Sequence, residues 1–268
     1  MKLGFIGAGN MGSAIVGGVI QAGLFKAADI IVSDMDNNML KKISEAHGVN
    51  TTNSNTEVAS QADVLFLAIK PNIYELVIKE IKDNVKPGII VVTIAAGQTM
   101  GGLVEKFGNN DKIKIVRTMP NTPALVNQGM TGVCPGANLG EDDKQIVLKI
   151  FNSIGKAAVL PEYLFDAYTG LAGSGPAYVF MFIEALADGG VLHGLPRAQA
   201  MEFAAQTVLG SAQMVLSGND HPGFLKDAVC SPGGTTIEAV AELELQGFRG
   251  AVISAVSAST QKSQKMSQ

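Results

Sequence analysis

The amino-acid sequence predicts an α/β protein in which a doubly wound parallel sheet is followed by an all-helical domain. In the first half of the chain, short apolar strands alternate with helical segments. This alternation is typical of a parallel sheet covered by helices on both faces. Beyond residue 160 the strand signals stop and only helical segments follow. We therefore expect one domain over residues 1–160 and a second over residues 161–268.

The expected elements of the first domain are short and alternate regularly along the chain. The strands are Leu3–Ile6, Asp29–Val32, Val64–Ile69, Ile89–Ile94, Ile113–Val116, Gly129–Val133 and Ala157–Val159. The helices are 9–23, Asn37–Ala46, Ile73–Ile81, Met100–Phe107 and Asp142–Phe151. The second domain is expected to hold helices at 163–172, 176–192, 197–217, 233–245 and 247–265, and a polar tail at 261–268 that frays.

Composition excludes several classes of protein. Two cysteines are too few for a disulfide framework or a cysteine metal site, so we expect a reducing cytoplasm and no metal. The net charge of −4, with scattered Lys and Arg, leaves no electrostatic footprint for nucleic acid. Glycines interrupt the weakly charged stretches, including Gly-Ser-Gly-Pro at 173–176, so we expect no membrane helix. The N-terminal segment is expected to be a buried strand rather than a signal peptide.

Charged residues are sparse, and the deficit is concentrated in one region. Only 16% of the residues are charged, against roughly 25% in typical soluble chains. The sparsest stretch lies between Leu164 and Ser217. Helices that are apolar on nearly all sides must be buried, and a small domain cannot bury them alone. We therefore expect a second subunit to cover them.

A glycine-rich motif follows the first strand. The segment Gly7-Ala8-Gly9-Asn10-Met11-Gly12 fits G-x-G-x-x-G and opens a helix, which is the context of a Rossmann dinucleotide-binding domain. Gly7 permits the tight turn, Gly9 lets the backbone approach a pyrophosphate, and Gly12 allows close packing of helix and strand. The free N–H groups of the helix end then face the phosphates. The alternative is a glycine-rich turn with no ligand.

The second strand ends in Ser33-Asp34-Met35-Asp36. An acidic residue at this place binds a ribose 2′-hydroxyl and favours NAD(H). Ser33, however, offers a hydrogen bond to a 2′-phosphate, and Lys41 and Lys42 lie one helix away, which suits NADP(H). Alternatively, the two aspartates only cap the next helix. The choice between the two cofactors is therefore left open.

Three other strand ends are expected at the same edge of the sheet, where ligands of doubly wound proteins bind. Lys70 and Pro71 follow Ala68, and the small residues Ala95 and Ala96 leave room for a flat ring. The segment 119–123, Met-Pro-Asn-Thr-Pro, either borders the nicotinamide or acts as a rigid connector.

The helical domain contains a candidate carboxylate site. In Ser231-Pro232-Gly233-Gly234-Thr235-Thr236, Ser231 resembles a helix cap and Pro232 a first-turn residue. The two glycines leave backbone N–H groups uncovered, and the threonines add hydroxyls. A helix N-terminus of this kind binds anions.

Together these segments resemble the Δ1-pyrroline-5-carboxylate reductases, and the resemblance spans nearly the whole chain. The segments that carry it are 5–11, 68–71, 119–123, 170–178, 185–190, 221–227 and 231–236. It implies hydride transfer from NADP(H) or NAD(H) to the imine carbon of a small-molecule substrate, giving L-proline. It also implies a homodimer through the helical domain, often assembled into a larger ring such as a decamer.

The resemblance also implies roles for individual residues. The threonine matching Thr236 lies near the imine nitrogen and would act in catalysis. The substrate would contact Glu162, Ser231, Gly233, Gly234, Thr235 and Thr236. The cofactor would contact Gly7, Ala8, Gly9, Asn10, Met11, Gly12, Ser33, Asn55, Ala68, Lys70, Pro71, Ala95 and Ala96. Some relatives have Asn where this chain has Ala228, which puts one cofactor contact of the family in doubt here.

Two other functions remain open on the sequence. One is a dehydrogenase of the hydroxyacid type. Such chains carry a catalytic Lys in the helical domain, where this chain has only Lys226, Lys262 and Lys265. The other is a non-catalytic NAD(P) sensor.

Overall fold

The computed structural model describes residues 1–267, and the chain divides into two compact units. The first contains residues 1–173 together with the C-terminal residues from 259 onwards, and the second contains residues 174–258. The expected domain boundary after residue 160 stays a prediction.

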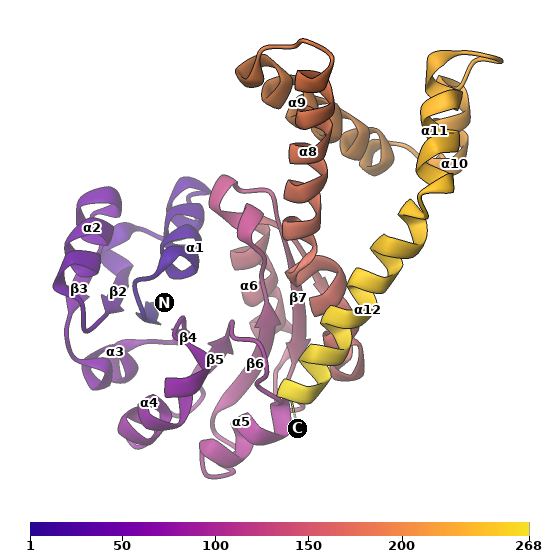
Figure 1. Ribbon diagram of the computed structural model, residues 1–268. Helices are drawn as coiled ribbons and strands as arrows, with labels where there is room; N and C mark the ends of the chain where they lie inside the picture. The colour runs from indigo at the N-terminus through magenta and orange to yellow at the C-terminus, as the bar shows by residue number, and fades with distance from the viewer. Residues whose placement is uncertain (268) are drawn as a thin grey trace. The chain divides into compact units, whose positions relative to one another are not determined.

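The first unit is built on an eight-stranded sheet with the order β3-β2-β1-β4-β5-β6-β7-β8 (Figure 1). Its strands are β1 Leu3–Ile6, β2 Ile30–Ser33, β3 Asn50–Thr52, β4 Val64–Leu67, β5 Ile90–Thr93, β6 Lys114–Met119, β7 Gly129–Pro135 and β8 Gly155–Val159. The predicted fold class is confirmed. The expectation of a wholly parallel sheet is wrong in one place, because β7 runs antiparallel to β6. The 120–128 connection holds a short 3-10 helix, Thr122–Val126, and no crossover helix, which a parallel return would need.

Helices cover both faces of the sheet, as the apolar strands require. They are α1 Asn10–Gln21, α2 Asn37–His47, α3 Asn55–Gln61, α4 Tyr74–Ile81, α5 Met100–Lys106 and α6 Glu141–Asn152. On one face, Phe5 and Phe66 stack with ring centroids 4.7 Å apart, and Phe151 of α6 packs edge-on against Phe66. On the other face, Leu65 and Leu67 pack with α3, α4 and α5. Adjacent residues of one strand therefore enter opposite cores.

Unit 1 also contains residues that follow the sheet. Helix α7, Phe165–Tyr168, runs into a π-helical turn, Thr169–Gly173. The end of α12, Phe248–Met266, belongs to the same unit, and Ser263 is buried there. The expectation of a frayed tail is therefore wrong for the described residues up to Met266.

Unit 2 consists of helices. They are α8 Gly175–Leu192, α9 Arg197–Ser217, α10 Pro222–Val229, α11 Thr235–Leu245 and most of α12. Its core of buried apolar residues contains only Ala187, Ala200 and Ala204 among the described residues. Large apolar side chains such as Met181 (69% exposed) and Leu209 (59%) lie on its surface. The scarcity of charged residues between Leu164 and Ser217 therefore coincides with apolar side chains that a single chain leaves exposed to solvent.

The run Glu162–Leu192 is long and apolar enough to cross a membrane, judged by length and composition alone. The expected interruption at 173–176 is present only locally, because a π-helical turn ends at Gly173 and α8 starts directly after it, with Ser174 as its N-cap. Pro176 is tolerated in the first helical turn, where its missing N–H is not needed. Composition alone thus does not decide between a membrane and a protein partner.

Candidate functional site: a dinucleotide cleft and an exposed helix start

The β1–α1 loop has the geometry that the glycine motif predicts. Gly7 adopts a φ of +105°, and a Cβ there would lie 2.4 Å from the Ala68 carbonyl oxygen. A Cβ on Gly12 would lie 2.8 Å from the Gly7 carbonyl oxygen. At Gly9, by contrast, a Cβ would meet no described atom within 4 Å. Gly7 and Gly12 thus serve backbone packing, and Gly9 leaves space for a ligand.

Helix α1 begins at Asn10, with Gly9 as N-cap and no capping side chain among residues 1–267. Its first N–H groups are therefore available to an anion, and the helix dipole favours negative charge there.

A cavity of about 720 Å³ opens beyond the carboxyl ends of the strands. This is the binding region of doubly wound folds. The predicted cofactor residues that line it are Gly7, Gly9, Asn10, Met11, Ser33, Asn55, Ala68, Lys70, Pro71, Ala95 and Ala96. Apolar residues that the sequence did not single out complete the wall, among them Met35, Ile69 and Leu125.

Ala8 and Gly12 are not among the described residues that line this cavity. Gly12 packs against the Gly7 backbone, and the Ala8 N–H donates to Asp34 Oδ2 at 2.7 Å. Asp34 itself does line the cavity. Asp36 is the N-cap of α2 and accepts from the Asn38 N–H at 2.8 Å. The helix-capping alternative thus holds for Asp36 and not for Asp34.

Ser33 is fully buried at the end of β2. Its Oγ donates to Asn55 Oδ1 at 2.8 Å, and Asn55 Nδ2 donates to Glu80 Oε2 at 2.9 Å. The hydroxyl hydrogen that would bind a 2′-phosphate is therefore already used. In the same region Lys41 pairs with Glu45 at 3.8 Å.

The 119–123 segment lines the cavity and is also fixed by side-chain hydrogen bonds, and its place beside the nicotinamide stays a prediction. Pro120 and Thr122 line the cavity. Asn121 Nδ2 donates to the Ala172 carbonyl oxygen at 3.0 Å, and Asn121 Oδ1 accepts from the Met130 N–H at 2.8 Å. The loop therefore borders the cavity and is also held rigidly.

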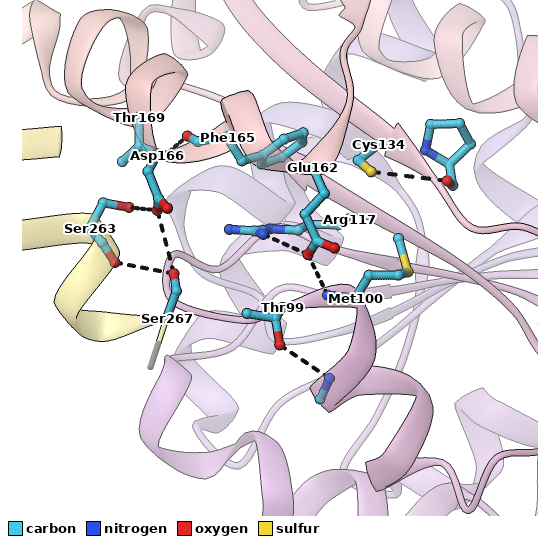
Figure 2. A network of polar contacts seen from close by, with 12 residues as sticks. Thr99, Met100, Arg117, Cys134, Glu162, Phe165, Asp166, Thr169, Ser263 and Ser267 are labelled. Atoms are coloured by element: carbon cyan, nitrogen blue, oxygen red, sulfur yellow. Dashed lines mark hydrogen bonds and ion pairs between the residues drawn. The ribbon is translucent and has the colours of Figure 1, made fainter. Parts of the chain in front are cut away.

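Glu162 lies in a polar network of unit 1 (Figure 2). Its Oε1 accepts from the Met100 N–H at 2.6 Å and from Arg117 at 2.8 Å. Arg117 is 5% exposed and lies over the Phe165 ring, 4.6 Å from its centroid. Burial, and then the Glu162 carboxylate, raise the pKa of the nearby Cys134 thiol. In this network Glu162 balances a buried cation and accepts from the first N–H of α5, whose N-cap is Thr99.

The 231–236 segment forms a turn and then a helix. The Gly234 N–H donates to the Ser231 carbonyl oxygen at 3.0 Å, and Gly233 has a φ of +66°. Helix α11 starts at Thr235 with Gly234 as N-cap. The expectation that Ser231 caps the helix is therefore wrong, because Ser231 closes the preceding turn. Thr235 is exposed and Thr236 half-buried, so the uncapped helix start is accessible.

Among residues 1–267 no group of three or more His, Cys, Asp and Glu residues is placed to hold a metal ion. The fold and the cleft instead define an oxidoreductase of the dinucleotide-dependent class. A family described as NADP oxidoreductase coenzyme F420-dependent matches residues 2–97. A second, described as Pyrroline-5-carboxylate reductase dimerisation, matches residues 162–266.

Whole-chain relatives give the family directly. The pyrroline-5-carboxylate reductase of Escherichia coli K12 is 50% identical over 99% of this chain and 98% of its own length. The pyrroline-5-carboxylate reductase of Arabidopsis thaliana is 42% identical over 100% of this chain and 96% of its own length. The crystal structure of the Plasmodium falciparum enzyme with NADP bound has a TM-score of 0.89 at 36% identity, covering 100% of this chain and 98% of its own. This chain belongs to the pyrroline-5-carboxylate reductase family, as the resemblance in its sequence indicated.

Proposed function

We propose that this protein catalyses the NAD(P)H-dependent reduction of Δ1-pyrroline-5-carboxylate to L-proline, the last step of proline biosynthesis. The observation that carries the proposal is the cleft, where an open Gly9 and an uncapped α1 lie in a chain aligned end to end with this family. The cleft fits a dinucleotide, since its volume is about 720 Å³ and its wall is largely apolar with few polar groups.

The proposed cofactor contacts follow from the wall of the cleft. The N–H groups at the start of α1 bind the pyrophosphate, and Gly9 lets it approach the backbone. Ala95, Ala96, Pro120 and Thr122 border the flat ring. When bound, the dihydronicotinamide supplies the hydride that reduces the C=N carbon.

The proposed substrate contacts lie at the start of α11. The N–H groups after Gly233 and Gly234 hold the substrate carboxylate, as a helix N-terminus favours anions. The Thr236 hydroxyl hydrogen-bonds the ring nitrogen and orients it. As the hydride forms the new C–H bond, the C=N electron pair moves to nitrogen, which keeps or takes up its proton. A protonated imine is already electrophilic, so positioning by these residues supplies most of the catalysis.

The test is turnover by the purified protein with pyrroline-5-carboxylate, run with NADH and NADPH side by side. We expect nucleotide oxidation that requires the imine and yields one proline for each nucleotide. Turnover of 2-hydroxy acids instead of the imine would favour the hydroxyacid dehydrogenase alternative. Nucleotide binding with no turnover of either substrate would favour the sensor.

A homodimer through the helical domain is the assembly that we propose, with a larger ring such as a decamer built from dimers. The support is the match of residues 162–266 to a dimerisation family and the exposed apolar side chains of α8 and α9. A second subunit would cover this apolar surface in a cytoplasmic protein. We therefore propose neither a membrane nor a nucleic acid as a partner. Sedimentation without detergent tests this: a monomer, or a protein that needs detergent to stay in solution, would contradict it.

A further inference from the structure

We propose that Asp34 makes the cofactor cleft of this enzyme select NADH over NADPH, an inference that rests on the proposed function. The sequence leaves this choice open, because Ser33, Asp34 and the lysines of α2 point to different cofactors. The structure separates their roles.

The Asp34 carboxylate is held in place by two backbone donors. Oδ2 accepts from the Ala8 N–H at 2.7 Å, and Oδ1 accepts from the Asp36 N–H at 2.9 Å. The side chain thus ties the end of β2 to the glycine loop that follows β1. An ionised carboxylate accepts about four hydrogen bonds, so roughly two acceptor positions remain for the hydroxyls of a ribose.

The groups around Asp34 do not offset its charge. The Ser33 hydroxyl donates to Asn55, whose amide in turn donates to Glu80, another carboxylate. Lys41 pairs with Glu45 on α2, and neither α2 lysine is among the described residues that line the cavity.

Lys70 is the one cation among the described lining residues, and it follows β4. Strand β1 lies between β2 and β4, so the two strand ends are about 10 Å apart by the spacing of neighbouring strands. The β2 end of the cleft therefore carries net negative charge.

These contacts discriminate between the two cofactors by charge and by hydrogen-bond direction. A ribose 2′-hydroxyl donates a hydrogen bond to the free acceptor positions of Asp34. A 2′-phosphate carries a charge of about −1.5 to −2 and offers mainly acceptors. It would face the carboxylate without a matching donor, and such juxtaposed like charges disfavour binding strongly.

The experiment measures calorimetric dissociation constants for NAD⁺ and NADP⁺, together with kcat/KM for NADH and NADPH. We expect wild type to bind NAD⁺ at least about tenfold more tightly than NADP⁺, and kcat/KM to follow the same order. In Asp34→Asn and Asp34→Ser, the affinity ratio shifts at least about tenfold toward NADP⁺. Asp36→Asn is the matched control, because it removes the same charge and Asn is an equally good helix cap. Its ratio stays at the wild-type value.

The wild-type ratio decides the inference even where a variant folds poorly. Equal or tighter binding of NADP⁺ by wild type would overturn it, as would Asp34 variants that keep the wild-type ratio. Imine reduction without any preference for NADH refutes this inference alone. Absence of imine reduction with either nucleotide refutes the proposed function, and the calorimetric ratio still reports on Asp34.

Discussion

At the scale of single residues, the glycines of the β1–α1 loop separate folding from binding. Gly7 and Gly12 are required by contacts of the chain with itself, since a Cβ at either would overlap backbone. Gly9 has an ordinary extended backbone, with φ −68° and ψ 179°, and open space where a side chain would be. No contact of the chain with itself therefore requires a glycine at that place, whereas close approach of a pyrophosphate to the backbone does.

Replacing Gly9 by Ala tests this distinction. We expect a melting temperature within about 2 °C of wild type, because the conformation suits Ala and surface-like changes alter stability little. Cofactor affinity is expected to fall at least about tenfold, because the methyl group blocks the close approach of the pyrophosphate. Gly7→Ala is the comparison and should destabilise the fold itself. Unchanged cofactor affinity in Gly9→Ala would contradict the role of the loop.

Glu162 has two possible roles, and its variants separate them. Glu162→Ala leaves the buried Arg117 cation without its partner, so we expect destabilisation of about 3 kcal/mol in chemical denaturation. Glu162→Gln keeps an acceptor for Met100 and Arg117 and should be milder. If Glu162 also contacts the substrate, Glu162→Gln raises KM for the imine while the fold persists. A stable Glu162→Ala protein would contradict the structural role.

At the scale of elements, the sequence predicts the apolar parts of the fold and misses the polar ones. The buried strands β1, β4 and β5 and helix α6 are predicted within a few residues, because apolar runs and amphipathic periodicity identify them. Strand β3, Asn50–Thr52, is not predicted because it is a polar strand at the edge of the sheet. Helix α3 is not predicted either, and it is only seven residues long. Helix α10 begins with Pro-Gly, and it is absent from the helices that the sequence predicts.

The residues of the candidate site likewise include some that the sequence predicts and some contacts that it misses. The glycine motif and the residues at the strand ends are predicted because a local signal marks each of them. The Asp34–Ala8 hydrogen bond joins residues far apart in the chain, and only the pairing of β1 with β2 brings them together. The packing of the C-terminal helix is likewise tertiary. The Ser263 hydroxyl donates to Asp166 Oδ1 at 2.6 Å, although the two residues are 97 positions apart in the chain (Figure 2).

The end of α12 supports the loop that lines the cleft. Gly97 has a φ of +75°, and a Cβ there would lie 3.2 Å from the Met266 carbonyl oxygen. We expect Ser263→Ala to destabilise the protein by about 1 kcal/mol, since it removes a buried hydrogen bond to a carboxylate. Ser267→Ala, whose hydroxyl lies 3.4 Å from the same oxygen, is the control and should have a smaller effect. Equal denaturation midpoints for Ser263→Ala and wild type would refute this anchoring.

At the scale of the whole molecule, the two units differ in how they bury apolar residues. The sheet unit fills two cores of its own, one on each face. The helical unit leaves large side chains exposed, and self-association is the simplest way to cover them.

Charges on the exposed helical surface should disrupt the proposed dimer. We expect the double variant Met181→Glu/Leu209→Glu to dissociate at concentrations where wild type is dimeric, as measured by sedimentation equilibrium. Leu76→Glu is the control, because Leu76 is 70% exposed but lies on α4 of the sheet unit. Dissociation by the control, or an intact dimer in the double variant, would place the interface elsewhere.

The fate of the transferred hydrogen tests the central claim most directly. The purified protein is incubated with pyrroline-5-carboxylate and reduced nicotinamide nucleotide in which both C4 hydrogens are deuterium, and the proline formed is analysed by mass spectrometry and NMR. Hydride transfer to the imine carbon predicts proline with a single deuterium at C5. Proline without deuterium, or nucleotide oxidation without proline, would contradict the account.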